Sequence, residues 1–255
     1  MKTRYAFLGV AFFASSFLIA QPSNDNAGNY ASWNTGSNGG NGFGAWDLTD
    51  NNADADTFAG YFLGDSTDGA GNLNTSGQSF GMFANPAGAF ATARRPFDGS
   101  FGVGSSFSVD LGINFDNGNK GFNLFAGGDE VFNLNVGFGA SVNSAFTLTA
   151  GPGLGYDYGG DNAVLSLTLD HVSSGVIDYS VLRESDLGNQ GVLFSGTISD
   201  LTAQPDSIAF YVSGTDGGGP ANNLYFNNLN LTAVPEPFAV TWFALASLGL
   251  LARQR

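Results

Sequence analysis

The sequence predicts an all-β protein built as an antiparallel β-sandwich. Three observations predict it: apolar and polar residues alternate in many short runs, glycine-rich turns separate these runs, and 38 Gly and 24 Phe accompany only 12% charged residues. Long surface helices usually carry more charge than this. A strand with one apolar face needs a second layer to cover that face, so the pattern predicts two packed sheets.

The clearest strand lies at residues 106–115. Its apolar positions alternate strictly with Ser, Asp, Gly and Asn, which predicts one buried and one exposed face. The same alternation predicts strands within 131–138, 163–170 and 207–214. The apolar positions of the first strand are Phe107, Val109, Leu111, Ile113 and Phe115. Shorter runs predict strands at 58–63, 79–83, 88–93, 122–126, 145–149, 176–182, 192–198 and 224–231.

Turn signals at 116–119, 127–129, 159–162 and 217–220 separate these runs. The stretch 115–125 predicts a β-hairpin because Asn117-Gly118 lies between two apolar runs. No linker interrupts the pattern, so residues 21–232 are expected to form a single sandwich domain. Its first part, 21–42, is rich in Asn, Gly and Ser and fits either an edge strand or a flexible segment.

Residues 1–20 have the pattern of a secretory signal peptide. Lys2 and Arg4 precede an apolar stretch from Ala6 to Ile19, and Ala20 supplies the small residue at the expected cleavage site. We therefore expect an N-terminal signal helix, handled by the Sec machinery and by signal peptidase, and an exported protein.

The other end of the chain carries a second apolar segment. Residues 238–252 contain no charge, and a helix of this length spans roughly 22 Å, less than the ~30 Å hydrocarbon core of a bilayer. Arg253 and Arg255 follow it, which places this end on the cytoplasmic side. Pro235 and Pro237 keep the preceding residues extended. The sequence predicts a short hydrophobic helix behind an extended, accessible segment.

This arrangement of Val234, Pro235, Glu236 and Pro237, an apolar helix and the two arginines resembles the PEP-CTERM sorting signal of Gram-negative bacteria that produce exopolysaccharide. The resemblance covers 234–255, within a terminal segment 233–255. It implies recognition by an exosortase, transient residence in the inner membrane, and delivery to the cell envelope, cell surface or extracellular matrix. The preceding strand, 224–231, loosely resembles the closing strand of jelly-roll or concanavalin-like modules. A plain anchor helix is the alternative.

Charge and cysteine content exclude several function classes. Residues 21–232 hold 21 acidic and 4 basic side chains, a balance of −17, so the domain repels phosphate backbones and no nucleic-acid partner is expected. The chain has no Cys, which excludes thiol catalysis and thiolate metal sites.

Catalytic signals are weak. His171 is the only histidine, no nucleophile elbow accompanies it, and a zinc site based on histidine lacks ligands. Glycoside hydrolysis needs two carboxylates at a defined separation, and Glu130 and Glu184 do not form such a pattern. We predict no catalytic residue and no enzyme. The alternative is a secreted polysaccharide-active enzyme, a glycoside hydrolase or lyase, that uses aspartates.

One acidic segment has the spacing of a calcium loop. Its residues are Asp50, Asn52, Asp54 and Asp56, and calcium takes several such oxygens. Ala55 and Tyr61 stand where an EF-hand has Gly and Glu. The segment is a candidate calcium site of another design, or a solvated acidic loop; no other cofactor is expected.

Glycan binding is the sharper expectation for the domain. Sugars are held by aromatic faces and by Asn, Asp and backbone hydrogen bonds, all abundant here. The candidate glycan-binding residues are Trp33, Trp46, Tyr156, Asp157 and Tyr158. The predicted role is structural or adhesive, with exopolysaccharide as the expected partner.

Overall fold

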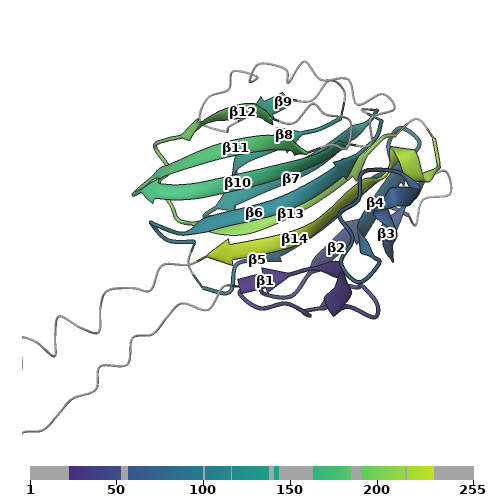
Figure 1. Ribbon diagram of the computed structural model, residues 1–255, viewed down its shortest axis with the longest axis horizontal. Coiled ribbons are helices and arrows are strands. Elements are labelled where there is room, and N and C mark those ends of the chain that lie inside the picture. Colours follow the sequence, from purple (N-terminus) through teal and green to yellow (C-terminus); the bar gives the residue numbers. More distant parts are fainter. Residues whose placement is uncertain are drawn as a thin grey trace, which may run out of the picture. The chain divides into compact units, whose positions relative to one another are not determined.

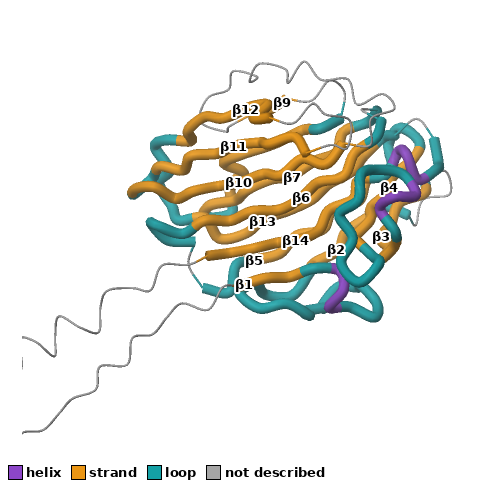
Figure 2. Tube along the Cα trace, in the orientation of Figure 1, coloured by secondary structure: helices purple, strands orange, loops and turns teal. Residues whose placement is uncertain are grey.

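The computed structural model describes residues 23–52, 57–99, 101–115, 117–137, 141–143, 163–184, 191–215 and 217–232, all within one unit, Gln21–Val234. The signal segment 1–20 with Ala20, the strand expected at 145–149 and the sorting segment 233–255 lie outside these ranges. Across the described ranges no helix has the length and apolarity to cross a membrane. The described chain is strand and loop, with three short 3-10 helices (Figure 2).

The described strands form two antiparallel sheets, which confirms the all-β prediction. The larger sheet has eight strands in the order β12-β11-β10-β6-β14-β4-β3, and β1 also pairs with β14 (Figure 1). Its strands are β1 (Ser23–Asp25), β3 (Phe58–Gly64), β4 (Ser79–Asn85), β6 (Ser106–Ile113), β10 (Ala163–Ser173), β11 (Val176–Glu184), β12 (Gly191–Ile198) and β14 (Leu224–Thr232).

The smaller sheet has six described strands in the order β2-β5-β13-β7-β8-β9. Its strands are β2 (Asp47–Asp50), β5 (Phe90–Pro96), β7 (Asn119–Ala126), β8 (Asp129–Asn135), β9 (Ser141–Asn143) and β13 (Pro205–Ser213). The 3-10 helices η1 (Ala27–Asn29), η2 (Ser66–Asp68) and η3 (Pro220–Asn222) lie in the connections.

The chain repeatedly crosses between the sheets, and this corrects one prediction. The segment 115–125 is not a hairpin, because β6 pairs with β10 and β14 whereas β7 pairs with β8 and β13. The turn around Gly118 (φ 63°) therefore joins two sheets. Lys120, fully buried, donates from Nζ to the carbonyl oxygens of Phe115 (2.7 Å) and Asn222 (2.9 Å), which fixes this crossing.

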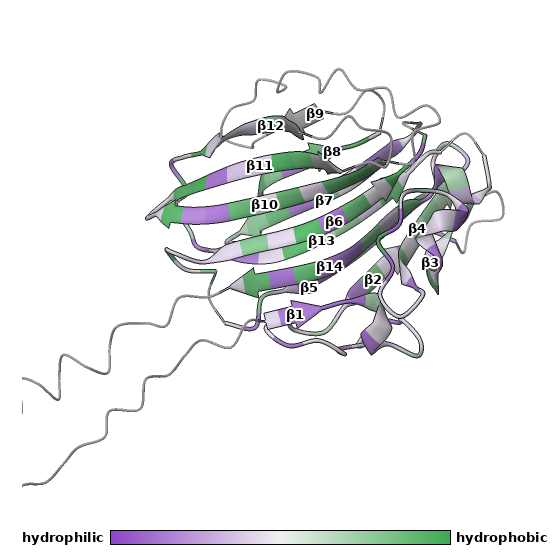
Figure 3. Cartoon of the chain, viewed as in Figure 1, coloured by the Kyte–Doolittle hydropathy of each residue, from purple (hydrophilic) through white to green (hydrophobic). Residues whose placement is uncertain are grey.

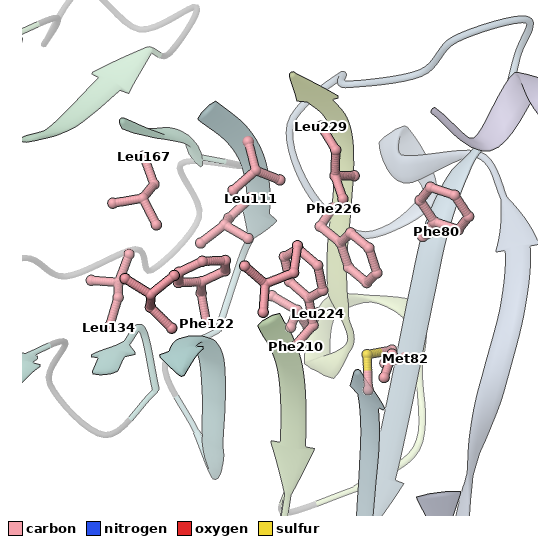
Figure 4. Packing of buried hydrophobic residues seen from close by; sticks show 14 of the residues in the cluster. Phe80, Met82, Leu111, Phe122, Leu134, Leu167, Phe210, Leu224, Phe226 and Leu229 are labelled. Atoms are coloured by element: carbon pink, nitrogen blue, oxygen red, sulfur yellow. The ribbon is translucent and has the colours of Figure 1, made fainter. Parts of the chain in front are cut away.

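The core lies between the sheets, where the apolar faces predicted by alternation meet. Hydropathy alternates visibly along β10, β11 and β14 (Figure 3). Phe210 of β13 and Phe226 of β14 stack with ring centroids 3.6 Å apart, one ring from each sheet (Figure 4). Burial of such rings supplies most of the driving force for packing the sheets together. Phe107, Val109, Leu111 and Ile113 are buried as predicted, whereas Phe115, which follows the end of β6 at Ile113, is 45% exposed.

The segment 23–42 is part of the folded domain. β1 pairs with β14, with Ser23 opposite Leu231. The Asp25 carboxylate is buried, forms an ion pair with the buried Arg95 guanidinium, and accepts a hydrogen bond from the Tyr30 hydroxyl (2.5 Å). Asn227 of β14, fully buried, accepts from Ala27 N (2.8 Å). The first strand is therefore tied to both sheets.

Candidate functional site

The outward face of the smaller sheet gathers the polar and aromatic side chains best suited to a ligand. On β13, Ile208, Phe210 and Val212 point into the core, so Ser207, Ala209 and Tyr211 point away from it. The same alternation operates on β5, which pairs with β13 on one side, and on β7, which pairs with it on the other (Figure 1). On β8, the next strand after β7, the register shifts between Leu124 and Phe125, which places Glu130 opposite Phe125 and Asn133 opposite Asn123. We call this surface the polar face; it comprises Phe90, Thr92, Arg94, Gly121, Asn123, Phe125, Glu130, Asn133, Ser207, Ala209 and Tyr211.

The Tyr211 side chain reaches across the neighbouring strand, β7. Its register partner on β7 is Gly121, and its hydroxyl reaches Asn133 Nδ2 on β8 at 2.9 Å. A Cβ added at Gly121 would lie 3.1 Å from that hydroxyl and directly against the Leu134 carbonyl oxygen. The absence of a side chain at position 121 therefore lets the phenol ring lie over β7. The Tyr211 side chain is half-buried, which leaves part of the ring exposed to solvent.

The Arg94 side chain starts on β5, opposite Ala209 of β13, and reaches across β13 toward β7. Its guanidinium lies 4.1 Å from the centroid of the Phe125 ring on β7, a cation–π contact. On the way, its Nη2 donates to Ser207 Oγ at 2.8 Å. Ser207 Oγ in turn donates to Asp206 Oδ1 at 2.6 Å. Arg94 is thereby held as a flat cationic plate rather than a free side chain.

Amides and one carboxylate complete the polar face. Asn123 and Asn133 are opposite each other in the β7–β8 register. Asn133 Nδ2 donates to Asn123 Oδ1 at 2.6 Å, and Asn123 Nδ2 donates to Glu130 Oε2 at 2.7 Å. The polar face thus holds a continuous hydrogen-bonded chain from Glu130 to the Tyr211 hydroxyl, which fixes the orientation of both amides.

Two pKa values on the polar face are raised. Burial is the main cause for Tyr211, and the nearby Glu130 charge adds to it while the hydrogen bond from Asn133 opposes it, so the pKa lies above its ordinary value. Partial desolvation raises the pKa of Glu130 above that of a free Glu side chain. At neutral pH the Tyr211 hydroxyl is therefore a neutral donor.

An exposed phenylalanine adds an apolar contact. Phe90, at the start of β5, is 41% exposed, and it lies on the same face as Thr92 and Arg94. Its Cα partner on β13 is Ser213, two residues from Tyr211. Phe90 therefore extends the polar face toward the start of β5, which lies beside the C-terminal end of β2.

The expectation that Trp33 and Trp46 bind a sugar is corrected by their burial. Trp33 is 6% and Trp46 1% exposed, and their rings pack edge to face at 5.4 Å within the core. Trp46 Nε1 donates to the Tyr30 hydroxyl at 3.2 Å. An indole enclosed in this way offers no free face to a sugar. Tyr156, Asp157 and Tyr158 lie outside the described residues.

The candidate calcium segment is described only in part, because Asp54 and Asp56 lie outside the described ranges. Asp50 Oδ1 accepts from Asn52 N at 3.0 Å, and Asn52 Oδ1 accepts from Ala59 N at 3.2 Å. Both oxygens are thus used by the local backbone. Over the described part of the chain, no group of three or more His, Asp or Glu side chains is placed to hold a metal ion.

His171 is a core residue. It is 2% exposed, its Nδ1 lies 2.7 Å from the Phe101 carbonyl oxygen, and its ring packs on the Phe101 ring. Among the described residues, no hydrogen bond joins the His171 ring to a Ser hydroxyl. A Ser-His-Asp arrangement built on His171 is therefore absent from the described residues.

Sequence reasoning did not find the polar face. The alternation predicted which residues of each strand point outward, yet Arg94, Asn123, Asn133 and Tyr211 come from four different strands. Their proximity depends on the order β5-β13-β7-β8, which brings distant segments together. The glycine at 121 was the local signal, since a glycine inside a strand indicates a close approach by another group.

Comparisons with known proteins do not assign the chain to a family. No family model and no curated protein matches the sequence. Solved structures with partly similar backbones include a protein of unknown function from Shewanella oneidensis MR-1, with 12% identity, a TM-score of 0.45, and 90% of this chain and 100% of that chain covered.

Two further matches have names that refer to carbohydrate. Lectin I-B4 from Griffonia simplicifolia, in its metal-free form, has 10% identity and a TM-score of 0.42, and covers 82% of this chain and 98% of its own. A glycosyl hydrolase family protein from Mycobacterium fortuitum has 12% identity and a TM-score of 0.40, with 73% and 91% covered. Similarity this low carries no argument about ligand or reaction, so the candidate function depends on the polar face itself.

Proposed function

We propose that the protein is an exported, jelly-roll or concanavalin-like adhesive protein that binds glycan on the polar face, without catalysis. The observation that carries the proposal is the placement of Tyr211 and Arg94 beside a chain of oriented amides. A sugar ring has apolar C–H patches and several hydroxyls. It therefore matches an aromatic or guanidinium plate that is flanked by fixed donors and acceptors.

The size of the polar face suits a short stretch of polysaccharide. From β5 to β8 there are three strand spacings, about 14 Å. Asn123, Asn133 and Tyr211 are half-buried and already hydrogen-bonded, so binding would immobilise few rotamers. A preorganised surface of this kind supports modest, specific recognition.

Catalysis is the alternative function, and carboxylate placement argues against it. The carboxylate of the polar face is Glu130, on β8, while Asp47 on β2, next to the polar face, is four strand spacings or about 19 Å away. Glycosidases place their two carboxyl groups at most about 9.5 Å apart. Asp206 lies closer, but its oxygens accept from Ser207 Oγ (2.6 Å) and Gly128 N (3.2 Å). Release of reducing ends from a polysaccharide would support the enzyme instead.

A glycan array probed with the purified domain tests the proposal. Wild-type protein is expected to bind a defined subset of glycans, and Tyr211→Ala is expected to lose at least tenfold in affinity. Asn230→Ala, an exposed Asn on the larger sheet, is the matched control and is expected to bind normally. No binding to any glycan would overturn the proposed function, as would equal binding by Tyr211→Ala.

We also propose that the tail directs sorting to the cell surface or the matrix by an exosortase. The support is the sequence of residues 234–255 alone. Glu236→Ala or Pro235→Ala should leave the tail attached in the native host, which mass spectrometry of the mature protein detects. Equal mature masses for variant and wild type would contradict sorting.

A further inference from the structure

The hydrogen-bonded chain on the polar face has a direction. Asn133 Nδ2 uses both of its hydrogens, one to Asn123 Oδ1 and one to the Tyr211 hydroxyl. Asn123 Nδ2 uses one hydrogen, to Glu130 Oε2. A carboxylate only accepts hydrogen bonds. Glu130 therefore determines that Asn123 directs its amide nitrogen, and not its oxygen, toward the Glu130 carboxylate.

This order leaves a defined set of free groups. Among the described residues nothing pairs with the second Asn123 N–H, the Tyr211 O–H, the Asn133 carbonyl oxygen or Glu130 Oε1. The first two donate and the last two accept. Donors and acceptors therefore alternate along the chain, which is the pattern that neighbouring hydroxyl groups of a sugar satisfy, because each hydroxyl both donates and accepts.

We propose that Glu130 is a positioning residue that sets this donor and acceptor pattern, and that the ligand is a neutral glycan with adjacent free hydroxyl groups. The inference rests on the proposed function, because it concerns the same surface. Glu130 acts through Asn123 and Asn133 as well as through its own free oxygen.

Charge supports a neutral ligand. A uronate or sulfate group near the chain would meet the Glu130 carboxylate, and the domain as a whole is strongly acidic. The one cation of the polar face, Arg94, is directed onto the Phe125 ring, with Nε and Nη2 both donating to Ser207 Oγ. It lies opposite Asp47 in the β2–β5 register.

The proposal has a pH signature. Protonation of Glu130 replaces a charge-assisted hydrogen bond by a weaker one, so affinity should fall as the pH falls through the Glu130 pKa, which lies above that of a free Glu side chain. The charged and titratable groups around it are Asp129, Asp206, Arg94 and Tyr211. A raised pKa also means that protonation of Glu130 favours the folded state. Its titration therefore cannot lower binding by unfolding the domain.

The experiment measures binding of the purified protein to a glycan array that carries neutral, uronate and sulfated glycans, followed by calorimetry with the strongest neutral binder from pH 4 to pH 8. Wild-type affinity is expected to fall by about fivefold toward low pH. Glu130→Gln keeps an acceptor for Asn123 but has no titrating group. The affinity of this variant should therefore not change over the pH range in which Glu130 titrates. Glu130→Ala should lose about tenfold at neutral pH.

A control variant separates the possible causes. Asp178→Asn changes an exposed carboxylate on the larger sheet and should keep the wild-type profile. Melting curves at each pH confirm that the domain is folded. Binding of acidic glycans alone, or a Glu130→Gln profile that still falls with wild-type amplitude, would overturn this inference and leave the proposed function standing. Absence of all glycan binding would overturn both.

Discussion

Arg95→Met removes a cation that lies wholly inside the domain. The Arg95 side chain is fully buried, forms an ion pair with Asp25, and donates to the Gly44 carbonyl oxygen (2.6 Å) and to Asn38 Oδ1 (2.5 Å). Its guanidinium also lies 4.9 Å from the ring centroids of Phe43 and of Trp46. The substitution leaves the Asp25 carboxylate buried without its cation.

Removing one partner of a buried ion pair costs about 3–5 kcal/mol of unfolding free energy. For a domain of this size each kcal/mol lowers the melting temperature by about 2–4 °C, so Arg95→Met should lower it by about 6–20 °C. Asp25→Leu combined with Arg95→Met removes both charges. It should be less destabilised than the sum of the single variants, because no lone buried charge remains.

Thermal unfolding followed by circular dichroism or calorimetry measures this. Arg94→Met is the matched control, since the preceding side chain lies on the polar face and is partly exposed. Its loss should cost at most about 1 kcal/mol. A melting temperature for Arg95→Met within about 2 °C of Arg94→Met would refute the reasoning.

Three further predictions concern the core and the polar face. Gly121→Val should destabilise the domain by about 2 kcal/mol or more, measured by urea unfolding, because any Cβ at 121 lies against the Leu134 carbonyl oxygen. Asn227→Leu should cost about 3 kcal/mol in the same assay, because it leaves Ala27 N and the Leu73 carbonyl oxygen unpaired in the interior. In an alkaline spectrophotometric titration, Tyr61 and Tyr211 should ionise well above the ordinary tyrosine pKa, since burial disfavours the phenolate.

Each of the three has a contradicting result. Wild-type unfolding curves for Gly121→Val or Asn227→Leu would contradict the packing described for those positions. Tyr211→Phe should remove part of the absorbance change that occurs above the ordinary tyrosine pKa. An unchanged titration curve for that variant would show that Tyr211 is not one of the tyrosines with a raised pKa.

The alternation of apolar residues predicted most of the strands, because period-two burial is a local property of one strand in contact with one core. Phe107 to Ile113 illustrates this, and β3, β4, β7, β11, β12 and β14 lie where short runs predicted strands. The short strands β2 and β9 were not predicted, and for β1 an edge strand within 21–42 was only one of two alternatives. Asp25 and Asp47 carry too little apolar pattern, and the partner strand alone defines their pairing.

Side-chain roles were less predictable than strands, since they depend on non-local neighbours. The tryptophans near loop-like sequence suggested exposure, yet Trp33, itself in a loop, contacts Tyr61, Phe80 and Phe226, which come from three different strands. Likewise, no local feature of β5 indicates that Arg95 points into the core while Arg94 lies over Phe125. That distinction follows from the period of the strand once its core face is known.

Side-chain amide NMR during a glycan titration tests the central claim most directly. With the strongest neutral binder from the array, the NH2 signals of Asn123 and Asn133 should shift in a saturable manner, while those of Asn228 and Asn230 on the larger sheet remain in place. Saturable shifts confined to Asn228 and Asn230, with Asn123 and Asn133 unchanged, would contradict glycan recognition by the polar face.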